Sequence, residues 1–261
     1  MTQCYIINIY IDTHIINLKM FYSLIVLVDM NAGNVAIIGG HHIRIEKVPF
    51  MASLRLNGTF HWCGASIIHE KFLLTAAHCI VPNRTYKVLL GTDDENGKNG
   101  ELLEIDEIIS HESYNNKTND YDFCLIKLKK PLTFGPKVGK IELAPPTLKF
   151  PIKTEFNITG WGSTGVEPVS AKLLQVEIPK SNRRKCKTLY AMHKQVITPR
   201  MICAGNLGHD SCQGDSGGPL TIGDMQVGVT SFGLGICGYM PGVYAKVASV
   251  TEWIQEKIIS G

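Results

Sequence analysis

The residues best suited to chemistry lie in one run, Asp210-Ser211-Cys212-Gln213-Gly214-Asp215-Ser216-Gly217-Gly218-Pro219. Glycines around Ser216 leave little bulk near its hydroxyl, and they leave backbone N–H groups free to point at one spot. That combination suits a nucleophilic serine beside an oxyanion site. The run is also compatible with a Gly-rich turn between two strands, so its interpretation depends on what else the chain holds.

A serine attacks a carbonyl at neutral pH only when a base takes its proton and an acid orients that base. His78 has the best context for the base, because it follows the apolar run Leu73–Ala77 and precedes a cysteine. Asp122 is the candidate acid, since it opens the apolar run Phe123–Leu128, where a buried carboxylate needs a partner. Asp120 competes with Asp122 for this role, and His78 taken alone could equally be a surface residue in a turn.

The elements that must position these residues are predicted to be short strands. From Ile37 onward, short apolar runs alternate with turn residues, which is typical of a β-sandwich or β-barrel. Asn57-Gly58 predicts a hairpin between its flanking runs. Only residues 248–259 look helical, with apolar residues on one face. The Pro-containing link Lys140–Pro151 divides this part of the chain, so we expect two β units of about 100 residues each.

Length and charge limit the possible functions. With 261 residues, 44% of them hydrophobic, the chain is long enough for one large domain or two small ones. Its net charge of +3 comes from 26 basic and 23 acidic residues, without a long run of either sign. We therefore expect neither nucleic acid nor an anionic membrane surface as a partner.

The eight cysteines, none in a C-x-x-C pair, favour disulfides over a metal site and hence an oxidising compartment. A zinc alternative would use Cys63, Cys79, His61 and His78, but their spacing fits no usual zinc motif. The acidic segment Asp93–Glu101 could hold calcium, yet it departs from the EF-hand pattern and is interpreted as a solvated loop. We expect no metal and no cofactor.

Residues 1–36 differ from the rest and are interpreted as a leader. The apolar run Phe21–Val28 follows Lys19-Met20 and fits the hydrophobic region of a signal peptide, and it is too short to span a bilayer. A start at Met20 would give a more ordinary signal, so residues 1–19 are a candidate upstream extension. An ordered N-terminal strand is the alternative. Four glycosylation sequons, at Asn57, Asn83, Asn116 and Asn157, are compatible with secretion.

From Ile37 to Gly261 the chain resembles the trypsin-like serine proteases of the chymotrypsin fold. Seven motifs in the same order carry this resemblance: Ile37-Ile38-Gly39-Gly40, Thr75-Ala76-Ala77-His78-Cys79, Asp122 ahead of Leu125-Ile126-Lys127-Leu128, Gly160-Trp161-Gly162, Gly214-Asp215-Ser216-Gly217-Gly218-Pro219, Ser231-Phe232-Gly233 and Pro241-Gly242-Val243-Tyr244. The chain order His, Asp, Ser is that of the family.

The resemblance implies an all-β fold of two six-stranded antiparallel β-barrels, roughly residues 37–139 and 152–247, with a C-terminal α-helix at 248–259. It also implies a secreted endopeptidase that works through an acyl-enzyme. Its partners would be protein or peptide substrates with Arg or Lys at P1 (the residue before the cleaved bond), and protein protease inhibitors. The enzyme would be a monomer without stable membrane insertion.

The family's roles fall on named residues of this chain. Ser216 would be the nucleophile, His78 the general base and then acid, and Asp122 the residue that holds the imidazole tautomer. The N–H groups of Gly214 and Ser216 would form the oxyanion hole. The substrate-binding positions would be Asp210, which pairs with a P1 Arg or Lys, together with Ser231, Phe232, Gly233 and Gly242. Phe232 stands where the family commonly has tryptophan, so we expect altered preference at neighbouring subsites.

By the same resemblance, three disulfides would join Cys63 to Cys79, Cys186 to Cys203 and Cys212 to Cys237. Cys124 would remain a buried free thiol, and Cys4 would be lost with the leader.

In the family a new N-terminus, here Ile37, forms an ion pair with the aspartate beside the nucleophile, here Asp215. The residue before it is Ala36, where the trypsin-type zymogens have Arg or Lys, so activation by a tryptic enzyme is not expected. Signal peptidase or another protease would have to expose Ile37.

Two other functions remain open. A non-catalytic homologue acting as a secreted binding module is the main alternative, because this fold also serves binding, usually after loss of a triad residue. A metal-dependent hydrolase is less well supported, since the chain lacks H-E-x-x-H.

Overall fold

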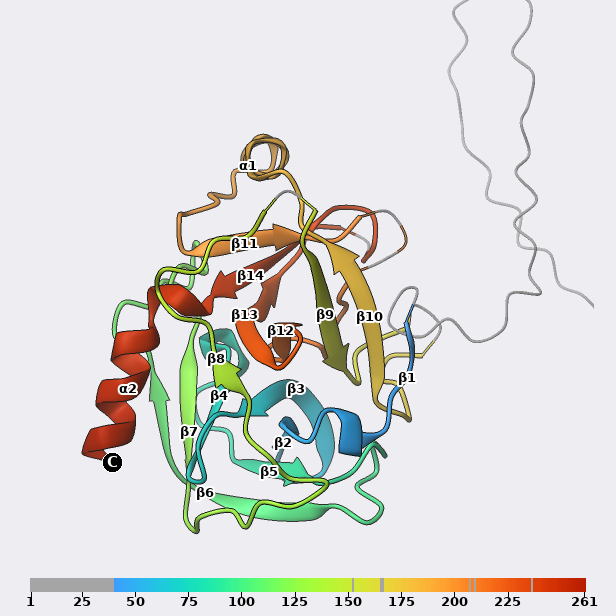
Figure 1. Ribbon diagram of the computed structural model, residues 1–261, viewed down its shortest axis with the longest axis vertical. Coiled ribbons are helices and arrows are strands. Elements are labelled where there is room, and N and C mark those ends of the chain that lie inside the picture. Colours follow the sequence, from blue (N-terminus) through green and yellow to red (C-terminus); the bar gives the residue numbers. More distant parts are fainter. Residues whose placement is uncertain (1–39, 152, 165–166, 207, 209, 236) are drawn as a thin grey trace, which may run out of the picture. The chain divides into compact units, whose positions relative to one another are not determined.

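The computed structural model describes residues 40–151, 153–164, 167–206, 208, 210–235 and 237–261. The candidate leader, Ile37 and the Ile37-Ile38-Gly39 part of the first motif lie outside these residues. The described part is built mainly of strands, with two α-helices and three short 3-10 helices (Figure 1). None of its helices is long and apolar enough to cross a bilayer.

The first half of the described chain forms a closed barrel. Its strands follow one another in the order β2-β3-β4-β7-β6-β5 and every pair is antiparallel. Their bounds are β2 Met51–Leu56, β3 Phe60–Ile67, β4 Phe72–Thr75, β5 Tyr86–Leu90, β6 Glu101–Ser110 and β7 Cys124–Leu128. The predicted hairpin joins β2 to β3, because Asn57 and Gly58 both have the positive φ (54° and 72°) that a tight turn requires.

The second half forms an eight-stranded sheet in the order β1-β10-β9-β12-β13-β14-β11, with β8 beside β13. The bounds are β1 His41–His42, β8 Glu142–Leu143, β9 Glu155–Gly160, β10 Leu174–Pro179, β11 Met201–Ala204, β12 Pro219–Ile222, β13 Met225–Phe232 and β14 Gly242–Lys246. Without the two-residue strands β1 and β8, this sheet has six strands, and its edge strands are β10 and β11. An isolated β-bridge between Lys180, directly after β10, and Ala204 of β11 connects these two edge strands. The all-β class with a C-terminal helix is therefore confirmed.

Burial explains why these segments form strands. All six residues of β2 are buried, so both faces of this strand are covered. β9 and β10 contribute apolar side chains such as Phe156, Ile158 and Val176 to a second core, which also contains Leu220 of β12. The strand β6, by contrast, is exposed along much of its length and carries four acidic residues. Each sheet thus has its own apolar interior, and the candidate site residues lie in loops, in η2 or at the ends of the strands β13 and β14.

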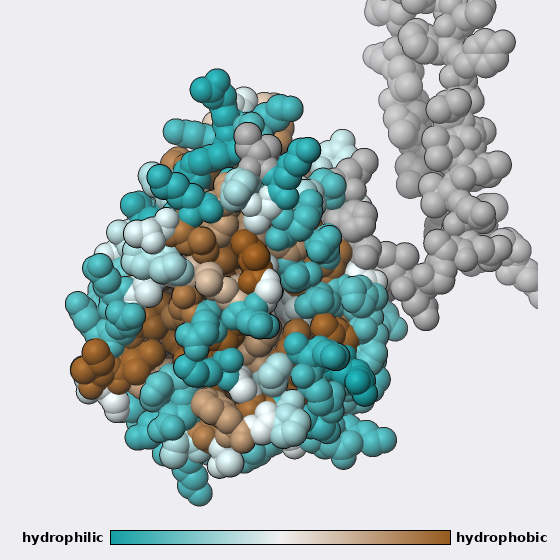
Figure 2. All heavy atoms as spheres, in the orientation of Figure 1, coloured by the Kyte–Doolittle hydropathy of each residue, from teal (hydrophilic) through white to brown (hydrophobic). Residues whose placement is uncertain are grey.

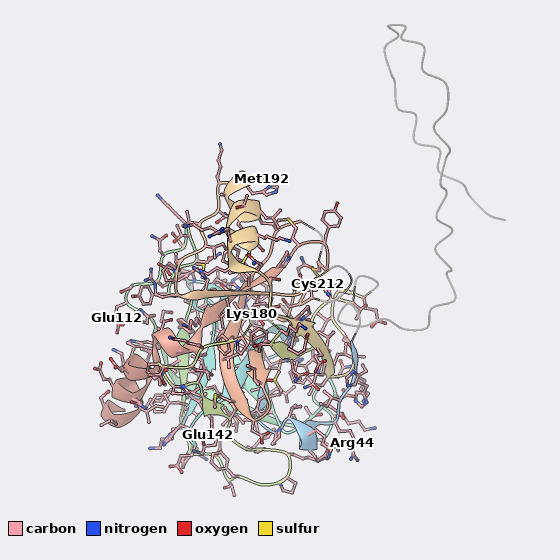
Figure 3. The ribbon with its side chains drawn as sticks, turned by 45° about the horizontal axis from the view of Figure 1, so that its top comes forward. Arg44, Glu112, Glu142, Lys180, Met192 and Cys212 are labelled. Atoms are coloured by element: carbon pink, nitrogen blue, oxygen red, sulfur yellow. A yellow bond between two sulfur atoms is a disulfide. The ribbon has the colours of Figure 1, made fainter. Side chains whose placement is uncertain are left out.

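The helices differ from the sequence prediction. The prediction that only residues 248–259 are helical was wrong, because a second helix, α1, spans Arg183–Met192. Its first turn is capped by the side chain of Asn182, which accepts a hydrogen bond from the Lys185 N–H at 3.1 Å, and it buries Cys186 and Tyr190 four residues apart. At its far end Met192 is exposed and points away from the sheet (Figure 3).

The C-terminal helix α2 spans Thr251–Ser260, and the residues before it form the 3-10 helix η3, Val247–Ser249. Ile254 of α2 is fully buried against the core of the first barrel. Ile259 is 86% exposed, and a brown apolar patch marks the end of α2 in Figure 2, where hydrophilic side chains cover much of the remaining face. The other short helices are η1, Ile45–Lys47, and η2, Ala77–Cys79.

Candidate active site

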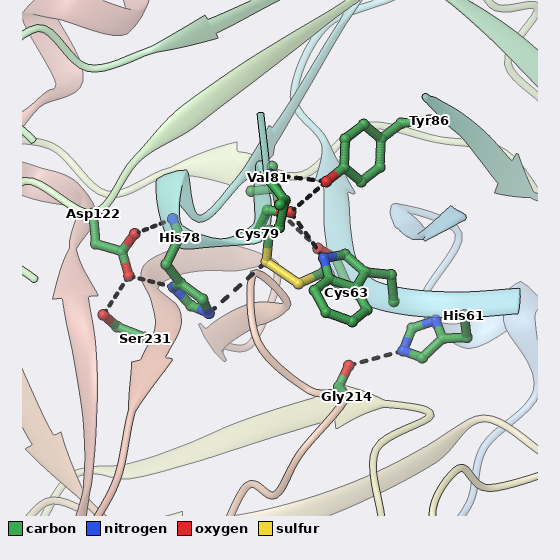
Figure 4. The surroundings of a disulfide bond; sticks show 12 residues. His61, Cys63, His78, Cys79, Val81, Tyr86, Asp122, Gly214 and Ser231 are labelled. Carbon is green, nitrogen blue, oxygen red and sulfur yellow. Dashed lines mark hydrogen bonds and ion pairs between the residues drawn. A yellow bond between two sulfur atoms is a disulfide. The ribbon is translucent and has the colours of Figure 1, made fainter. Parts of the chain in front are cut away.

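His78 and Asp122 meet because the strands that carry them pair. β4 ends at Thr75, just before η2, and its partner β7 begins at Cys124, with Thr75 opposite Cys124. His78 Nδ1 lies 2.7 Å from Asp122 Oδ2, and the His78 backbone N–H donates to Oδ1 at 2.9 Å (Figure 4). A carboxylate only accepts hydrogen bonds, so Nδ1 carries the proton and Nε2 is left as the basic nitrogen.

Asp122 is completely buried and is surrounded by donors. Besides the two bonds from His78, its Oδ2 accepts a third from the Ser231 hydroxyl at 2.5 Å. A disulfide between Cys63 and Cys79 ties η2, which carries His78, to β3 (Figure 4). Burial of a carboxylate is unfavourable unless donors compensate, and three donors do so here. The imidazole is thus fixed in one tautomer and one orientation.

Ser216 lies in a loop that backbone hydrogen bonds hold against the first barrel. Its carbonyl accepts from Gly64 N–H at 2.8 Å, and Gly217 N–H donates to Thr230 O at 2.8 Å. A disulfide joins Cys212 of this loop to Cys237. Within the described residues no hydrogen bond joins Ser216 Oγ to His78 Nε2. Such bonds between nucleophile and base often form only with substrate in place.

The backbone at Gly214 has the form that an oxyanion hole needs. Gly214 has φ +95°, which side-chain-bearing residues rarely adopt, and a Cβ there would lie 3.0 Å from the Cα of Gly162. Neither the Gly214 nor the Ser216 N–H donates to an acceptor in the described part of the chain. Both are therefore available to a substrate oxygen.

A buried histidine, His61, which the sequence suggests only as a zinc ligand, binds the carbonyl of the same glycine. His61 Nε2 donates to Gly214 O at 2.8 Å, and Ser53 donates to His61 Nδ1 at 2.7 Å. Burial lowers the pKa of His61 to about 4, so the ring is neutral at pH 7. Since a carbonyl can only accept, Nε2 carries the single ring proton. No local sequence signal marks this role, because its partners lie 8 and 153 residues away.

A pocket of about 120 Å³ opens beside Ser216. It brings together the predicted substrate-binding positions, which lie far apart in the sequence, and adds others that the sequence did not indicate. The lining residues are Asp210, Ser211, Cys212, Gln213, Ser216, Thr230, Ser231, Phe232, Gly233, Leu234, Gly235, Cys237 and Gly242. All of the predicted substrate-binding residues are among them.

Asp210 is the buried carboxylate of this pocket. It is 3% exposed and accepts hydrogen bonds from Ser211 N–H at 2.8 Å, from Gly238 N–H at 3.3 Å and from Tyr244 O–H at 3.4 Å. Burial raises its pKa to about 6, although these donors oppose the shift. No ion pair to Asp210 occurs among the described residues. A cation entering the pocket would therefore stabilise its ionised form.

Gly242 must be a glycine for steric reasons. A Cβ at this position would lie 2.7 Å from Asp210 Oδ1 and 2.9 Å from the Tyr244 hydroxyl. Gly233, on the same pocket, has no atom within 4 Å of such a Cβ, so a side chain there would enter free space. The two glycines therefore act differently: one lets the carboxylate approach the wall, and the other leaves the pocket open.

Asp215, beside the nucleophile, is also fully buried but has fewer partners. Its carboxylate accepts hydrogen bonds from Gly162 N–H and Cys212 N–H, each at 2.9 Å. Burial raises its pKa to about 7. No cation pairs with it among the described residues, and Ile37, the predicted partner, lies outside them.

Other sequence hypotheses have clear structural outcomes. The Cys63 and Cys79 sulfurs are bonded to each other, so they are not available as zinc thiolates. A third disulfide joins Cys186 to Cys203, and Cys124 is a buried free thiol. In the acidic segment, Asp94 pairs with Lys172 at 3.1 Å and Glu95 with Arg55 at 2.9 Å. Asp120, the competitor of Asp122, pairs with Arg200 and does not reach His78.

The comparisons with known proteins agree with one another. The family model described as Trypsin matches residues 37–254. Trypsin 5G1 of Aedes aegypti is 37% identical over 226 residues, covering 84% of each chain, and Hypodermin-B of Hypoderma lineatum is 37% identical over 228 residues, covering 84% of this chain and 86% of its own. The solved structure of neuropsin, a serine protease expressed in mouse brain, superposes with a TM-score of 0.76 at 32% identity, covering 84% of this chain and 98% of that one.

Proposed function

Since the chain belongs to the trypsin family of serine proteases, we propose that it is an active endopeptidase that cleaves after Arg or Lys. The observation that carries the P1 preference is Asp210, a buried carboxylate without a cationic partner in the described chain, in a pocket beside Ser216. A substrate guanidinium or ammonium would supply that partner and form charge-assisted hydrogen bonds.

The proposed mechanism follows from the paired groups. His78 Nε2 takes the proton of the Ser216 hydroxyl as its oxygen attacks the scissile carbonyl, and the imidazolium that forms is stabilised by Asp122. His78 then returns the proton to the leaving amine, which leaves an acyl group on Ser216. Water, deprotonated by the same nitrogen, attacks the acyl-enzyme and releases the second product.

Charge develops on the substrate oxygen during both attacks. The N–H groups of Gly214 and Ser216 are the proposed donors, because both lack an acceptor in the described chain. His61 supports this arrangement by binding the Gly214 carbonyl at 2.8 Å, which fixes the peptide unit that directly follows the Gly214 N–H. Each such donor is worth roughly 3 kcal/mol of transition-state stabilisation.

Activation is proposed to require a free amine at Ile37. That amine would form an ion pair with Asp215 and lower the pKa that burial raises to about 7. Because Ala36 precedes Ile37, a trypsin-type activator should leave the full chain unchanged, whereas the variant Ala36→Arg should be cut and should gain activity. N-terminal sequencing of the product at a residue other than Ile37 would contradict this route.

Localisation, glycosylation, oligomeric state and inhibition are proposed on the same basis. The protein would be secreted, glycosylated at its sequons and monomeric, and protein protease inhibitors would compete with its protein or peptide substrates. The leader at residues 1–36 and the three disulfides support secretion, since disulfides persist in oxidising compartments.

The test combines labelling with a substrate series. The processed protein should react with a serine-directed fluorophosphonate, and Ser216→Ala should abolish that reaction while leaving the fold intact by circular dichroism. Peptide substrates differing only at P1 should be cleaved after Arg or Lys, and Asp210→Ser should remove this preference. Equal or faster cleavage after an aromatic P1 residue would disprove the specificity. Failure of correctly processed protein to react would favour the binding-module alternative.

A further inference from the structure

The turn directly before Asp122 has an unfavourable backbone. Asn119 and Tyr121 both lie in the left-handed region, with φ of 53° and 54°. Asparagine tolerates this region, but for a bulky aromatic residue it is unusual and requires external support. Phe123 N–H closes the turn by donating to Tyr121 O at 2.8 Å. The position of Asp122 therefore depends on whatever holds Tyr121.

One support is an ion pair that crosses from the first barrel to the second sheet. Asp120 lies in the loop between β6 and β7, whereas Arg200 immediately precedes β11. Arg200 Nε donates to Asp120 Oδ1 at 2.9 Å, and its Nη2 donates to Oδ2. Thr198, two residues before Arg200, donates its hydroxyl to Oδ1 at 2.8 Å. The pair is bidentate, and the side chains are 15% and 31% exposed for Asp120 and Arg200 respectively.

Tyr121 itself is held between two planar groups. Arg200 Cζ lies 4.5 Å from the centre of the Tyr121 ring, and the His111 ring stacks on Tyr121 at 4.5 Å with planes 25° apart. His111 in turn contacts Trp253 of α2, with ring centres 4.7 Å apart. One guanidinium thus binds the carboxylate of Asp120 and covers the ring of the next residue.

The ionisation of both partners agrees with this geometry. Burial opposes ionisation of Asp120, but hydrogen bonds from Arg200 and Thr198 outweigh it, and the pKa of Asp120 is lowered. The bond from Asp120 raises the pKa of Arg200. Both groups are therefore charged across the neutral pH range, and the pair persists under the conditions in which a protease of this kind would work.

We propose that Arg200 and Asp120 are positioning residues for catalysis: by clamping the Asn119–Tyr121 turn across the two halves of the fold, they hold Asp122 in register with His78. Neither residue touches the reacting atoms. The clamp acts through Tyr121, the one residue between Asp120 and Asp122, because a change in φ at Tyr121 would move the Asp122 carboxylate. The inference rests on the proposed proteolytic function for its kinetic consequence only.

The kinetic test uses Arg200→Met, which keeps a long side chain but removes the charge and the planar guanidinium group. In the processed protein we expect kcat to fall about 10- to 100-fold, with KM changed less than about 3-fold, because misplacement affects the chemical step more than the pocket. Arg200→Lys should recover part of the loss, since it restores the charge without the bidentate geometry or the stack. Asp120→Asn should resemble Arg200→Met.

A matched control comes from the first barrel. Lys87 and Glu104 form an ion pair at 2.6 Å between the neighbouring strands β5 and β6, and neither residue has a hydrogen bond or ion pair with Asp122. Lys87→Met removes one charge of an ion pair in the same way and should leave kcat unchanged. A loss of kcat in Arg200→Met that is matched in Lys87→Met would overturn the proposal, and so would unchanged kcat in Arg200→Met and Asp120→Asn.

A second readout does not need turnover. The short hydrogen bond from His78 Nδ1–H to Asp122 should give a downfield proton NMR signal, which should broaden or move upfield in Arg200→Met and Asp120→Asn but not in Lys87→Met. If the wild-type protein proves inactive but this signal responds as expected, the clamp stands and the proposed function fails. If the signal is the same in all variants, the clamp is disproved whatever the activity. Should Arg200→Met fail to fold, kcat and the His78 Nδ1–H signal of Asp120→Asn test the same proposal.

Discussion

Asp122 and Asp215 are both completely buried, yet their surroundings differ. Asp122, at the end of the first barrel, accepts three hydrogen bonds from side-chain and backbone donors, and one of them comes from an imidazole that can become a cation. Asp215, in the loop of the second sheet, accepts two backbone bonds only, and burial raises its pKa to about 7.

The difference shows which half of the site is complete. Among the described residues, every buried side-chain polar atom of the first-barrel half has a hydrogen-bond partner, and Ser231 of β13 supplies one of the donors to Asp122. The second-sheet half holds a carboxylate without a charge partner, a second one in Asp210, and a buried Thr230 hydroxyl without a hydrogen-bond partner in the described chain. A free amine at Ile37 and a cationic substrate would satisfy the two carboxylates, so this half is expected to respond to processing and to ligand.

The largest expected effect is the loss of kcat when Asp122, in the half whose buried groups all have partners, is replaced. Asp122→Asn replaces the acceptor of Nδ1–H by a group that favours the wrong tautomer, so kcat should fall about 10,000-fold. KM should change little, because the Asp210 pocket is untouched. Steady-state kinetics on the processed protein measure this, with Asp106→Asn, an exposed ion-pair partner of Lys127, as the control. A kcat within tenfold of wild type would refute the assignment of Asp122.

The incomplete half should show itself in the pH dependence of folding. An acid whose pKa is raised on folding stabilises the protein when protonated, so its contribution is present near pH 4 and is lost as the pH rises toward 7. For Asp215, with a pKa of about 7 in the fold, the loss amounts to about 4 kcal/mol across that window. Urea unfolding of the unprocessed chain carrying Ser216→Ala should show this fall, and adding Asp215→Asn should make it shallower, leaving the smaller fall that Asp210 contributes. An equal slope in both chains would contradict the assignment.

A smaller effect is expected where the two halves touch. Ser53→Ala leaves the buried Nδ1 of His61 without its donor, which should reduce the free energy of unfolding by about 1–3 kcal/mol. Chemical denaturation in the Ser216→Ala background measures it, and the exposed Ser113→Ala serves as control. No loss of stability would mean that the hydrogen bond between Ser53 and His61 contributes nothing, and the coupling of Gly214 to the first barrel would then need another explanation.

The smallest expected effect is a gain in stability, whereas Asp122→Asn should lose activity and Ser53→Ala should lose stability. Thr230 is 5% exposed and its hydroxyl has no partner among the described residues, so Thr230→Val should raise the free energy of unfolding by about 1 kcal/mol. Thr251→Val is the matched control, because that buried hydroxyl donates to Ala144 O at 3.1 Å and its loss should destabilise the protein. If both variants lose stability equally, the Thr230 hydroxyl does have a hydrogen-bond partner. The two halves of the site would then differ less in how well their buried polar groups are satisfied.

Much of the fold and of the site was predictable because it follows from local patterns in the sequence. Short apolar runs between turn residues gave the all-β class, and Asn57-Gly58 gave the first hairpin, because a positive φ is a property of those residues themselves. The motifs around His78, Asp122 and Ser216 indicated the family, which the comparisons confirm. These motifs are short, so their residues are close in sequence as well as in space.

The helix α1 was missed because its signal is weak in isolation. It carries four basic residues and only two buried side chains, Cys186 and Tyr190, so its apolar stripe is narrow. The disulfide from Cys186 to Cys203 and the bond from Tyr190 O–H to Pro241 O attach it to the second sheet. Tertiary contacts, and not the periodicity of the segment, decide that it is a helix there.

By itself, the sequence determined which residues are chemically suited to serve as nucleophile, base and acid, because side-chain chemistry and short spacings are local properties. Only the tertiary structure decided how well each is supplied with partners. Asp122 obtains its donors from residues 44 and 109 positions away, and the turn before it is held by Arg200, 80 positions from Asp120. Burial and hydrogen bonding depend on such distant contacts, so two aspartates that look alike in the sequence end with different partners and different affinities for a proton.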